Sequence, residues 1–528
     1  MTLLALFFLN LALTLQNVWP TLKVRWVGEC SVDLAALLFV LALLSTRPGL
    51  LKRGHASILA VLLLLLTLGR YVDETAPALY GRPINLYWDL PHVGSVIGMV
   101  TTVMSGWLLA AGIVAAIVLL ALLYLLLRLA IRQVIRAMED RRWRLGLGTA
   151  AALLLLSFAA QGLDDRVPKL PEFAHPVSLT FAEQAMRIRD AMADSRAVQE
   201  LPASPPLQRD FSVLAGSDVV VLLLESYGRS TYDRPEFAKA LRGSRAVLAA
   251  DIADTGRKVV SAFIESPTFG GNSWLAQITL MAGIEVRDQQ RYDLLLTQQR
   301  ESLSTAFKAR GYRSVAVMPG LRLSWPEGSF YRFDTIYGAD ALDYKGPEFG
   351  WWRIPDQYAL ARVDQLEVQR SPRAPLFVFY PTISTHLPFR PVPPYQADWQ
   401  RVLTPDPFDA VALHESLAQE PEWTNLGRAY VDAMSYSFAT IGGYLRTRPA
   451  APLVLIVLGD HQPAASVTGE GASWDVPVHV ITDNDAVIAA LMNRGFSAGL
   501  EPAETHLGPM QELTTLLLDA LSTAPTGP

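Results

Sequence analysis

Long, nearly uncharged apolar stretches occupy most of the first third of the chain. A helix needs about 20 apolar residues to cross the hydrocarbon core of a membrane, so these stretches predict a multi-pass α-helical membrane domain. We expect five spans, near Met1–Val18, Val32–Leu44, Ile58–Leu68, Val93–Leu129 and Leu145–Gln161. The first stretch lacks the basic start and the cleavage site of a signal peptide, so we interpret it as a span.

Basic residues indicate how these spans are oriented. Two loops carry them: Arg47, Lys52 and Arg53 follow the second span, and Arg128, Arg132, Arg136, Arg141, Arg142 and Arg144 follow the fourth. Because Lys and Arg accumulate in cytoplasmic loops, both loops are predicted to be cytoplasmic. The chain after about Gly162 is then outside the cytoplasm. The loop over 71–92 is also external, either as an aromatic interfacial segment or as a plain connector.

The remaining composition limits the domain plan and the partners. With 528 residues, the chain is too long for one ordinary domain. We expect a transmembrane anchor over 1–163, a Pro-rich linker with a helical segment over 164–210, and an extracytoplasmic domain over 211–528. A net charge of -5 gives no reason to expect nucleic acid as a partner. The single cysteine, Cys30, excludes an intrachain disulfide.

Apolar runs alternate with helix-compatible segments after Phe211. Continuous apolar runs bounded by turn residues suit strands buried on both faces of a mainly parallel sheet. The predicted strands are Val219–Leu224, Ser314–Met318, Leu376–Tyr380, Leu453–Leu458 and Val476–Ile481. The predicted helices are Trp274–Ala282, Leu303–Arg310, Pro355–Arg370, Asn425–Thr447 and Asp485–Arg494. This order predicts an α/β domain of three layers.

Polar side chains follow three of the predicted strands. Glu225 follows the first strand, His386 lies just after the Leu376–Tyr380 strand, and Asp460 and His461 follow the Leu453–Leu458 strand. In open α/β sheets the ligand site lies at the carboxyl ends of the strands, so we expect these side chains to converge.

Ser273 joins them from a separate loop, because it follows the pair Gly270-Gly271 and precedes a predicted helix. Glycines let the backbone turn sharply and approach a ligand closely. Backbone N–H groups at a helix start favour an anion, so Ser273 is a candidate nucleophile toward a phosphate or sulfate ester. Alternatively, Asn272 or Ser273 caps the helix.

Carboxylates and an imidazole suit a divalent metal ion. We predict that Glu225, Asp460 and His461 are ligands and that Ser273 completes the shell. A metal-bound hydroxyl loses its proton more easily, which favours Ser273 as a nucleophile. His386 would protonate the leaving oxygen or hold the substrate.

Four sequence blocks resemble a known family. They are Leu224-Glu225-Ser226-Tyr227, Gly270-Gly271-Asn272-Ser273-Trp274-Leu275-Ala276-Gln277, His386-Leu387-Pro388-Phe389 and Gly459-Asp460-His461. Together they resemble the sulfatase-like branch of the alkaline-phosphatase superfamily, and more narrowly the lipoteichoic acid synthases and their phosphoglycerol and phosphoethanolamine transferase relatives. The resemblance implies a periplasmic sulfatase-like catalytic domain and one divalent metal ion, with Mn²⁺ expected first and Zn²⁺ or Mg²⁺ as alternatives.

The resemblance also implies residue roles. Ser273 matches the nucleophile, which is usually Thr in the lipoteichoic acid synthases, and His386 matches a histidine near the head group. Arg322 and Trp325 lie where the family binds glycerol phosphate, and we predict that both contact substrate.

One departure from the family's pattern and one further group of residues concern substrate binding. Glu327 stands near the position of an expected arginine, which leaves the donor head group open. Trp351, Trp352 and Arg353 form a second candidate substrate wall; alternatively, Trp351 and Trp352 are a core or interfacial aromatic pair.

Two further departures from the family's patterns narrow the class of enzyme that we expect. True sulfatases need x-Pro-x-Arg after the nucleophile position, whereas Ser273 is followed by Trp274-Leu275-Ala276-Gln277. Lipid A phosphoethanolamine transferases usually carry several disulfides, which this chain cannot form.

The leading expectation is therefore transfer of phosphoglycerol, or a similar phospho-head group, from a membrane phospholipid to an envelope glycan or lipid acceptor through a phospho-Ser273 intermediate. The enzyme alternatives are a phosphoethanolamine transferase and a phosphodiesterase or phosphatase with the same site. The non-enzyme alternative is an envelope-assembly or glycan-binding protein. We expect a bacterial inner-membrane location with the catalytic domain outside the cytoplasm.

Overall fold

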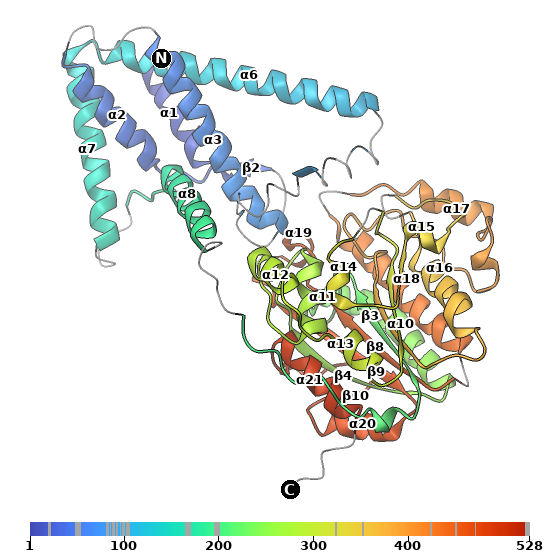
Figure 1. Cartoon of the computed structure of the whole chain (residues 1–528). Coiled ribbons are helices and arrows are strands. Elements are labelled where there is room, and N and C mark those ends of the chain that lie inside the picture. Colours follow the sequence, from blue (N-terminus) through green and yellow to red (C-terminus); the bar gives the residue numbers. More distant parts are fainter. Residues whose placement is uncertain are drawn as a thin grey trace. The chain divides into compact units, whose positions relative to one another are not determined.

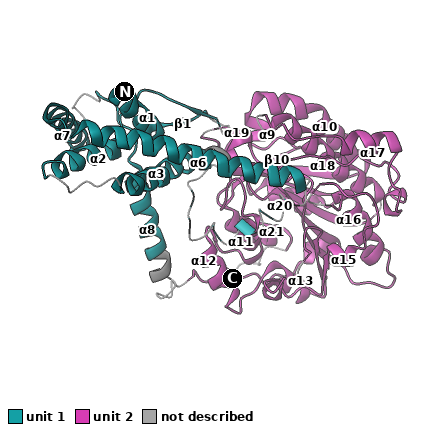
Figure 2. Ribbon diagram, turned by 90° about the horizontal axis from the view of Figure 1, so that it is seen from above, with its two compact units in different colours: residues 1–197 teal, residues 198–528 magenta. Residues whose placement is uncertain are grey.

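The computed structural model divides into two compact units, residues 1–197 and 198–528 (Figures 1 and 2). It describes residues 1–18, 23–47, 54–80, 106–163, 170–194, 201–322, 325–350, 353–422, 425–448, 451–469 and 471–522, with scattered residues between 84 and 101. Each unit is described separately below.

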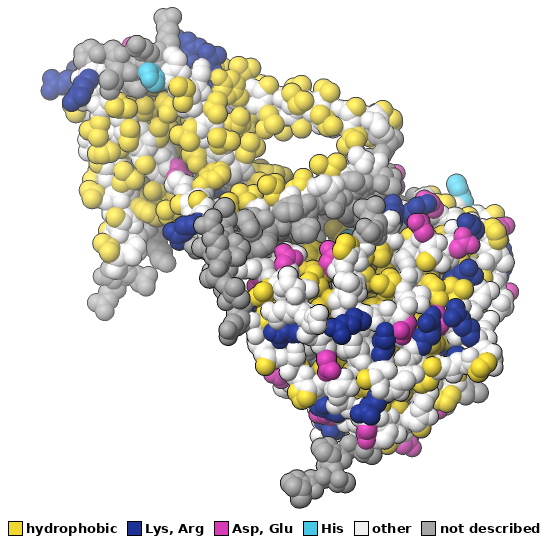
Figure 3. Space-filling model, viewed as in Figure 1, with side chains coloured by type: hydrophobic (Ala, Val, Ile, Leu, Met, Phe, Trp, Pro, Cys, Tyr) yellow, Lys and Arg dark blue, Asp and Glu magenta, His cyan; other side chains and the backbone are white. Residues whose placement is uncertain are grey.

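Apolar helices make up most of the first unit. They are α1 (Thr2–Thr14), α2 (Val32–Leu44), α3 (His55–Tyr80), α6 (Gly106–Ala137) and α7 (Arg141–Leu163). Of the described helices, α3 over 55–77, α6 and α7 are long and apolar enough to cross a membrane, while α1 and α2 are shorter. Apolar side chains dominate the surface of this unit (Figure 3). In water such a surface would be strongly unfavourable, whereas lipid covers it without cost.

The five predicted spans correspond to these five helices, with differences at the ends. The described part of the fourth predicted span is α6, and most of 93–105 lies outside the described residues. A short β1–β2 pair, Gln16–Asn17 with Val24–Arg25, follows α1. The helix α8 (Val177–Asp194), expected within a linker, packs on α3, where Thr180 donates a hydrogen bond to Asp73 at 3.1 Å.

An eight-stranded sheet forms the centre of the second unit in the described chain. Its order is β10-β4-β9-β8-β3-β7-β5-β6. The strands are β3 (Asp218–Leu224), β4 (Lys258–Glu265), β5 (Arg313–Met318), β6 (Thr335–Gly338), β7 (Leu376–Pro381), β8 (Leu453–Gly459), β9 (Asp475–Thr482) and β10 (Ser497–Ala498). All five predicted strands are present. The predicted α/β class with a mainly parallel sheet is confirmed for the run from β8 to β6.

One of the five predicted strands does not belong to the parallel run. The strand β9, predicted as Val476–Ile481, runs antiparallel to both β8 and β4. Strands β4, β6 and β10 were not predicted. The strand β4 begins with Lys258 and ends with Glu265, and it carries the buried polar residue Ser261, so it lacks the continuous apolar run that identified the other strands.

Helices cover both faces of the sheet and close two hydrophobic cores. The larger helices are α10 (Pro235–Asp254), α11 (Ser273–Ala282), α12 (Gln289–Leu296), α13 (Leu303–Lys308), α16 (Asp356–Val363), α17 (Ala410–Leu417), α18 (Gly427–Thr447), α20 (Asp485–Met492) and α21 (Met510–Ala520). The short ones are α9 (Ser230–Asp233), α14 (Gly328–Tyr331), α15 (Ala339–Leu342) and α19 (Ala465–Thr468).

Side chains of β3 alternate between the two cores. Val219, Val221 and Leu223 join the core under α11, α13, α20 and α21. Val220, Leu222 and Leu224 join the core under α10, α16 and α18. Because successive side chains point to opposite faces, a strand buried on both sides must be apolar throughout, as β3 is. This rigid central strand delivers Glu225 to the carboxyl edge of the sheet.

Candidate functional site

The site begins where β3 and β8 end side by side. These strands are parallel, and Leu224 pairs with Gly459, so Glu225 and Asp460 emerge next to each other. Only glycine fits before Asp460, because a Cβ on Gly459 would lie 1.8 Å from the carbonyl oxygen of Tyr227. The local sequence Gly459-Asp460 thus allows the two strand ends to approach closely.

Glu225, Asp460 and His461 form a buried cluster whose ligand atoms all lie within 4.8 Å of one another. His461 Nε2 is 3.5 Å from Glu225 Oε1 and 3.6 Å from Asp460 Oδ2. The other ring nitrogen, Nδ1, contacts the carbonyl oxygen of Gln462 at 2.7 Å. A carbonyl can only accept, so Nδ1 carries a proton and, in neutral His461, Nε2 offers its lone pair to the cluster.

Backbone N–H groups orient the Asp460 carboxylate, and two threonine side chains hold the Glu225 peptide. Asp460 Oδ1 accepts hydrogen bonds from the N–H of Ser226 at 2.8 Å and of His461 at 2.7 Å. The Glu225 peptide is held by two threonines of the loop after β7. The Thr382 hydroxyl oxygen accepts from Glu225 N–H at 3.2 Å, and the Thr385 hydroxyl donates to Glu225 C=O at 2.5 Å.

The Ser273 hydroxyl reaches this cluster from the first residue of α11. Its Oγ lies 3.0 Å from Glu225 Oε2 and 3.1 Å from His461 Nε2. Asn272 occupies the capping position with a left-handed backbone (φ 61), but its side chain makes no capping hydrogen bond. The capping alternative therefore does not describe these side chains. Ser273 is half-buried.

The cluster has more hydrogen-bond acceptors than protons. Ser273 has one hydroxyl proton and faces two acceptors, Glu225 Oε2 and the Nε2 of neutral His461. Burial and then the charge of Glu225 raise the pKa of Asp460 to about 7. For His461, burial lowers the pKa, but the charges of Asp460 and Glu225 outweigh it, and the net shift is upward.

Excess buried negative charge of this kind is stabilised by a cation. Two carboxylates and one imidazole with a fixed tautomer fit Mn²⁺, Zn²⁺ or Mg²⁺ as a donor set. Glu225, Asp460 and His461 would hold the ion, with Ser273 beside it.

His386 lies on the loop that holds Glu225. Its Nδ1 contacts the Leu387 carbonyl oxygen at 2.8 Å, so Nδ1 carries the proton of the neutral ring. Burial lowers the pKa of His386 to about 4, and the charge of His461 adds to this lowering. His386 is therefore neutral near pH 7, with its proton on Nδ1 and none on Nε2.

The four predicted substrate residues are only partly accounted for. The ring of Trp325 stacks on Tyr331 at 5.4 Å between centroids. Arg353 is exposed and pairs with Glu348, and Arg322 is exposed as well. Trp352 lies outside the described residues. Their roles in substrate binding remain predictions.

Sequence reasoning missed the residues that support the cluster. Gln462 is fully buried; its carbonyl accepts from Gly270 N–H at 3.1 Å, and its side chain accepts from Ser230 N–H at 3.3 Å. It thereby links the turn after β8 to the glycine turn that presents Ser273. Thr382 and Thr385 carried a weak signal, as hydroxyl residues directly after a buried strand.

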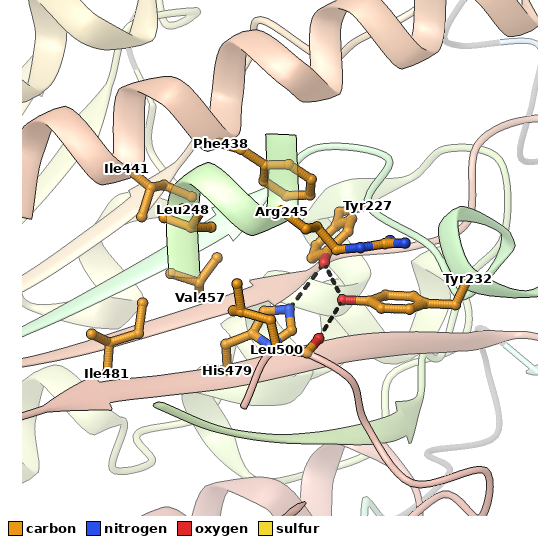
Figure 4. Close-up of a pocket in the computed structure, with 10 residues that line it drawn as sticks. All are labelled: Tyr227, Tyr232, Arg245, Leu248, Phe438, Ile441, Val457, His479, Ile481 and Leu500. Atoms are coloured by element: carbon orange, nitrogen blue, oxygen red, sulfur yellow. Dashed lines mark hydrogen bonds between the residues drawn. The ribbon is translucent and has the colours of Figure 1, made fainter. Parts of the chain in front are cut away.

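A second group of buried polar side chains surrounds Tyr227 (Figure 4). The Tyr227 hydroxyl is 2.9 Å from both Tyr232 Oη and His479 Nε2, and His479 Nδ1 is 2.6 Å from Ser261 Oγ. Burial and then the charge of Arg245 lower the pKa of His479 to about 3. These groups surround a cavity of about 10 Å³, no larger than one water molecule. They brace Tyr227, which follows Glu225 by two residues.

Comparison with known proteins gives structural neighbours only. The sequence matches no known family model and no curated protein. A full-length lipooligosaccharide phosphoethanolamine transferase from Neisseria meningitidis is 14% identical, over 98% of this chain and 96% of that chain, with a TM-score of 0.47.

Two further structures are similar over about two thirds of this chain. An alkaline-phosphatase superfamily protein from Vibrio parahaemolyticus is 16% identical, over 61% of this chain and 69% of that chain (TM-score 0.39). A phosphoglycerol transferase from Streptococcus pyogenes is 13% identical, over 65% and 82% (TM-score 0.36).

Proposed function

We propose that the protein is a metal-dependent transferase that moves a phospho-head group, phosphoglycerol in the first instance, from a membrane phospholipid to a hydroxyl of an envelope glycan or lipid. The observation that carries the proposal is the position of Ser273 Oγ, 3.0 Å from Glu225 and 3.1 Å from His461. A structural serine at a helix start would turn its hydroxyl to the backbone.

The proposed reaction has two steps. In the first, Ser273 Oγ attacks the phosphorus of the lipid, the bond to the diacylglycerol oxygen breaks, and a phospho-Ser273 ester forms. The serine proton ends on diacylglycerol. In the second step an acceptor hydroxyl attacks the ester, loses its proton and regenerates Ser273. A divalent cation held by Glu225, Asp460 and His461 would acidify the attacking hydroxyl and neutralise charge on the phosphoryl oxygens.

The chain's own groups support each step. Ser273 is the first residue of α11, so the phosphoryl group would face the free N–H groups and the positive end of that helix. His386, neutral and with Nδ1 bound to the Leu387 carbonyl, would exchange a proton with the leaving or entering oxygen through Nε2. The membrane unit would keep the site near its lipid donor on the extracytoplasmic face of the inner membrane.

The test uses the purified full chain in vesicles of phosphatidylglycerol or phosphatidylethanolamine, with Mn²⁺ or with EDTA. We expect diacylglycerol release that needs Mn²⁺ and is lost in Ser273→Ala. Diacylglycerol release from phosphatidylethanolamine but not from phosphatidylglycerol would assign the protein to the phosphoethanolamine transferases. Free glycerol phosphate in the presence of acceptor glycan, with no glycan product, would assign a phosphodiesterase. A protein that binds no metal and releases no diacylglycerol would refute the proposal and favour a glycan-binding or envelope-assembly role.

A further inference from the structure

Asp356 is a fully buried carboxylate that the proposed reaction does not use. It is the first residue of α16 and is only 2% exposed. Its Oδ1 accepts from the Tyr380 hydroxyl at 2.5 Å and from Ile383 N–H at 3.0 Å. Its Oδ2 accepts from Ser384 N–H at 2.9 Å. Both carboxylate oxygens therefore bind the segment that follows β7.

That segment is a tight turn with a direct hydrogen bond to Glu225, one of the three proposed metal ligands. His386 N–H donates to the Ile383 carbonyl at 3.1 Å, which closes the turn over 383–386. Within the turn, the Thr385 hydroxyl donates to the Glu225 carbonyl at 2.5 Å. Asp356 therefore holds the first half of a turn whose second half carries Thr385 and His386.

The chemistry of this anchor requires a carboxylate. Two backbone N–H groups and a tyrosine hydroxyl all donate to Asp356, and an ionised carboxylate offers acceptors only. Asparagine has nearly the same shape but replaces Oδ2 with an NH₂ donor. That donor would face Ser384 N–H, so one buried donor would stay unsatisfied or the turn would move. The start of α16 also favours a negative side chain, because the N-terminal end of a helix dipole is positive.

We propose that Asp356 is a positioning residue: through the turn over 383–386 it sets the Glu225 peptide, and hence the metal site, together with the position of His386. This inference rests on the proposed metal site. Asp356 touches neither metal nor substrate in this arrangement. It acts through Ile383 and Ser384 on one side of the turn and through Thr385 on the other.

Glu367 supplies a matched control. It is also fully buried, at 1% exposure, in the π-helical turn Asp364–Val368 that continues α16. It accepts from Arg313 Nε at 2.7 Å, Arg313 Nη2 at 2.8 Å and the Tyr337 hydroxyl at 2.5 Å. Arg313 is the first residue of β5. Glu367 therefore binds the amino ends of the parallel strands, whereas the proposed metal ligands lie at their carboxyl ends.

The experiment compares wild type, Asp356→Asn and Glu367→Gln as full chains in detergent. The first readout is the Mn²⁺ dissociation constant by titration calorimetry. The second is amide hydrogen exchange of peptides covering 382–390 in EDTA. We expect Asp356→Asn to weaken Mn²⁺ binding about 10-fold, the lower end of the range for outer-sphere partners of metal ligands, and to speed exchange at 382–390. Glu367→Gln should leave both unchanged.

Each outcome bears on one claim. Equal Mn²⁺ affinity in wild type and Asp356→Asn overturns the positioning role and leaves the metal site intact. Equal weakening in both variants also overturns it, because general loss of stability would then suffice. If Asp356→Asn does not fold, Tyr380→Phe removes one hydrogen bond to the same carboxylate and should produce a smaller loss of affinity in the same direction. Absence of Mn²⁺ binding in wild type refutes the metal site itself.

Discussion

Replacing Asp460 by asparagine should stabilise the metal-free protein at the same time as it destroys the metal site. Asparagine keeps the Oδ1 acceptor that binds the N–H groups of Ser226 and His461, and it removes the buried charge. Since the carboxylate lies beside Glu225 in a buried cluster, its charge costs free energy until a cation neutralises it.

The magnitude follows from the pKa. Burial and the charge of Glu225 raise the pKa of Asp460 to about 7, from an ordinary value of about 3.9. A carboxyl group with a raised pKa binds more protons in the folded state, so stability falls as pH rises between these two values. The cost is about 1.5 kcal/mol at pH 5 and about 4 kcal/mol at pH 8, as an upper estimate at 1.36 kcal/mol per pH unit.

Asp460→Asn has no such cost, so its advantage over wild type should grow by about 2.5 kcal/mol from pH 5 to pH 8. The raised pKa of His461 acts in the same direction, because it stabilises wild type below its folded pKa and not above it. At roughly 2 °C per kcal/mol, the melting temperature of the variant should gain about 5 °C relative to wild type.

The assay is thermal unfolding of the full chain in detergent with EDTA, at pH 5 and pH 8, followed by tryptophan fluorescence. Added Mn²⁺ should raise the melting temperature of wild type and not that of the variant, because only a folded site binds the ion. A variant that is less stable than wild type at pH 8 in EDTA would refute the reasoning, since Asp460 would then be a structural carboxylate.

Asp475→Asn provides a control for which the expected change in stability at pH 8 has the opposite sign. Although burial raises its pKa, hydrogen bonds from His506, Ser473 and Arg229 outweigh this effect and hold the pKa below its ordinary value. A carboxylate with a lowered pKa stabilises the fold above its unfolded pKa, and this contribution is lost as pH falls through the folded value. Asp475→Asn should therefore lower stability at pH 8, where Asp460→Asn raises it.

Three other substitutions have definite expected results. Ser273→Ala should abolish diacylglycerol release while Ser273→Thr keeps it within about 10-fold, since both hydroxyls can serve as nucleophile; equal rates for Ala and wild type would exclude the serine ester. Gly459→Ala should abolish Mn²⁺ binding in calorimetry, because its Cβ would lie 1.8 Å from the Tyr227 carbonyl oxygen; unchanged affinity would contradict this packing. Asp218→Asn should lower the free energy of unfolding by about 3 kcal/mol, because it removes the nearer carboxylate partner of the buried Arg448 and leaves Asp364 at 3.8 Å; no loss in urea unfolding would show that Asp364 alone compensates the charge of Arg448.

The convergence of the site could be predicted because its signal is local. Glu225 and Asp460 directly follow apolar strands, and parallel strands bring their carboxyl ends to one edge. Ser273 follows a glycine pair, which marks a sharp turn at any position in a fold. None of these inferences needed the order of the strands in the sheet.

What the sequence did not reveal depends on partners distant in the chain. The direction of β9 was missed because a strand buried on both faces has the same apolar pattern whether it runs parallel or antiparallel. Asp356 resembles an ordinary acidic residue in a first helical turn; its role depends on Ile383 and Ser384, more than 25 residues later. Trp325 gave an aromatic signal that fits stacking on Tyr331 as well as substrate binding.

The most direct test of the central claim is peptide mass spectrometry of the full chain after incubation with phosphatidylglycerol, and separately with phosphatidylethanolamine, in Mn²⁺. The account predicts a glycerol-phosphate adduct on the peptide that contains Ser273, formed without acceptor and absent in Ser273→Ala. An ethanolamine-phosphate adduct at Ser273 would keep the mechanism and change the donor. Diacylglycerol release with the adduct on another residue, or undiminished release by Ser273→Ala, would contradict the claim that Ser273 is the nucleophile.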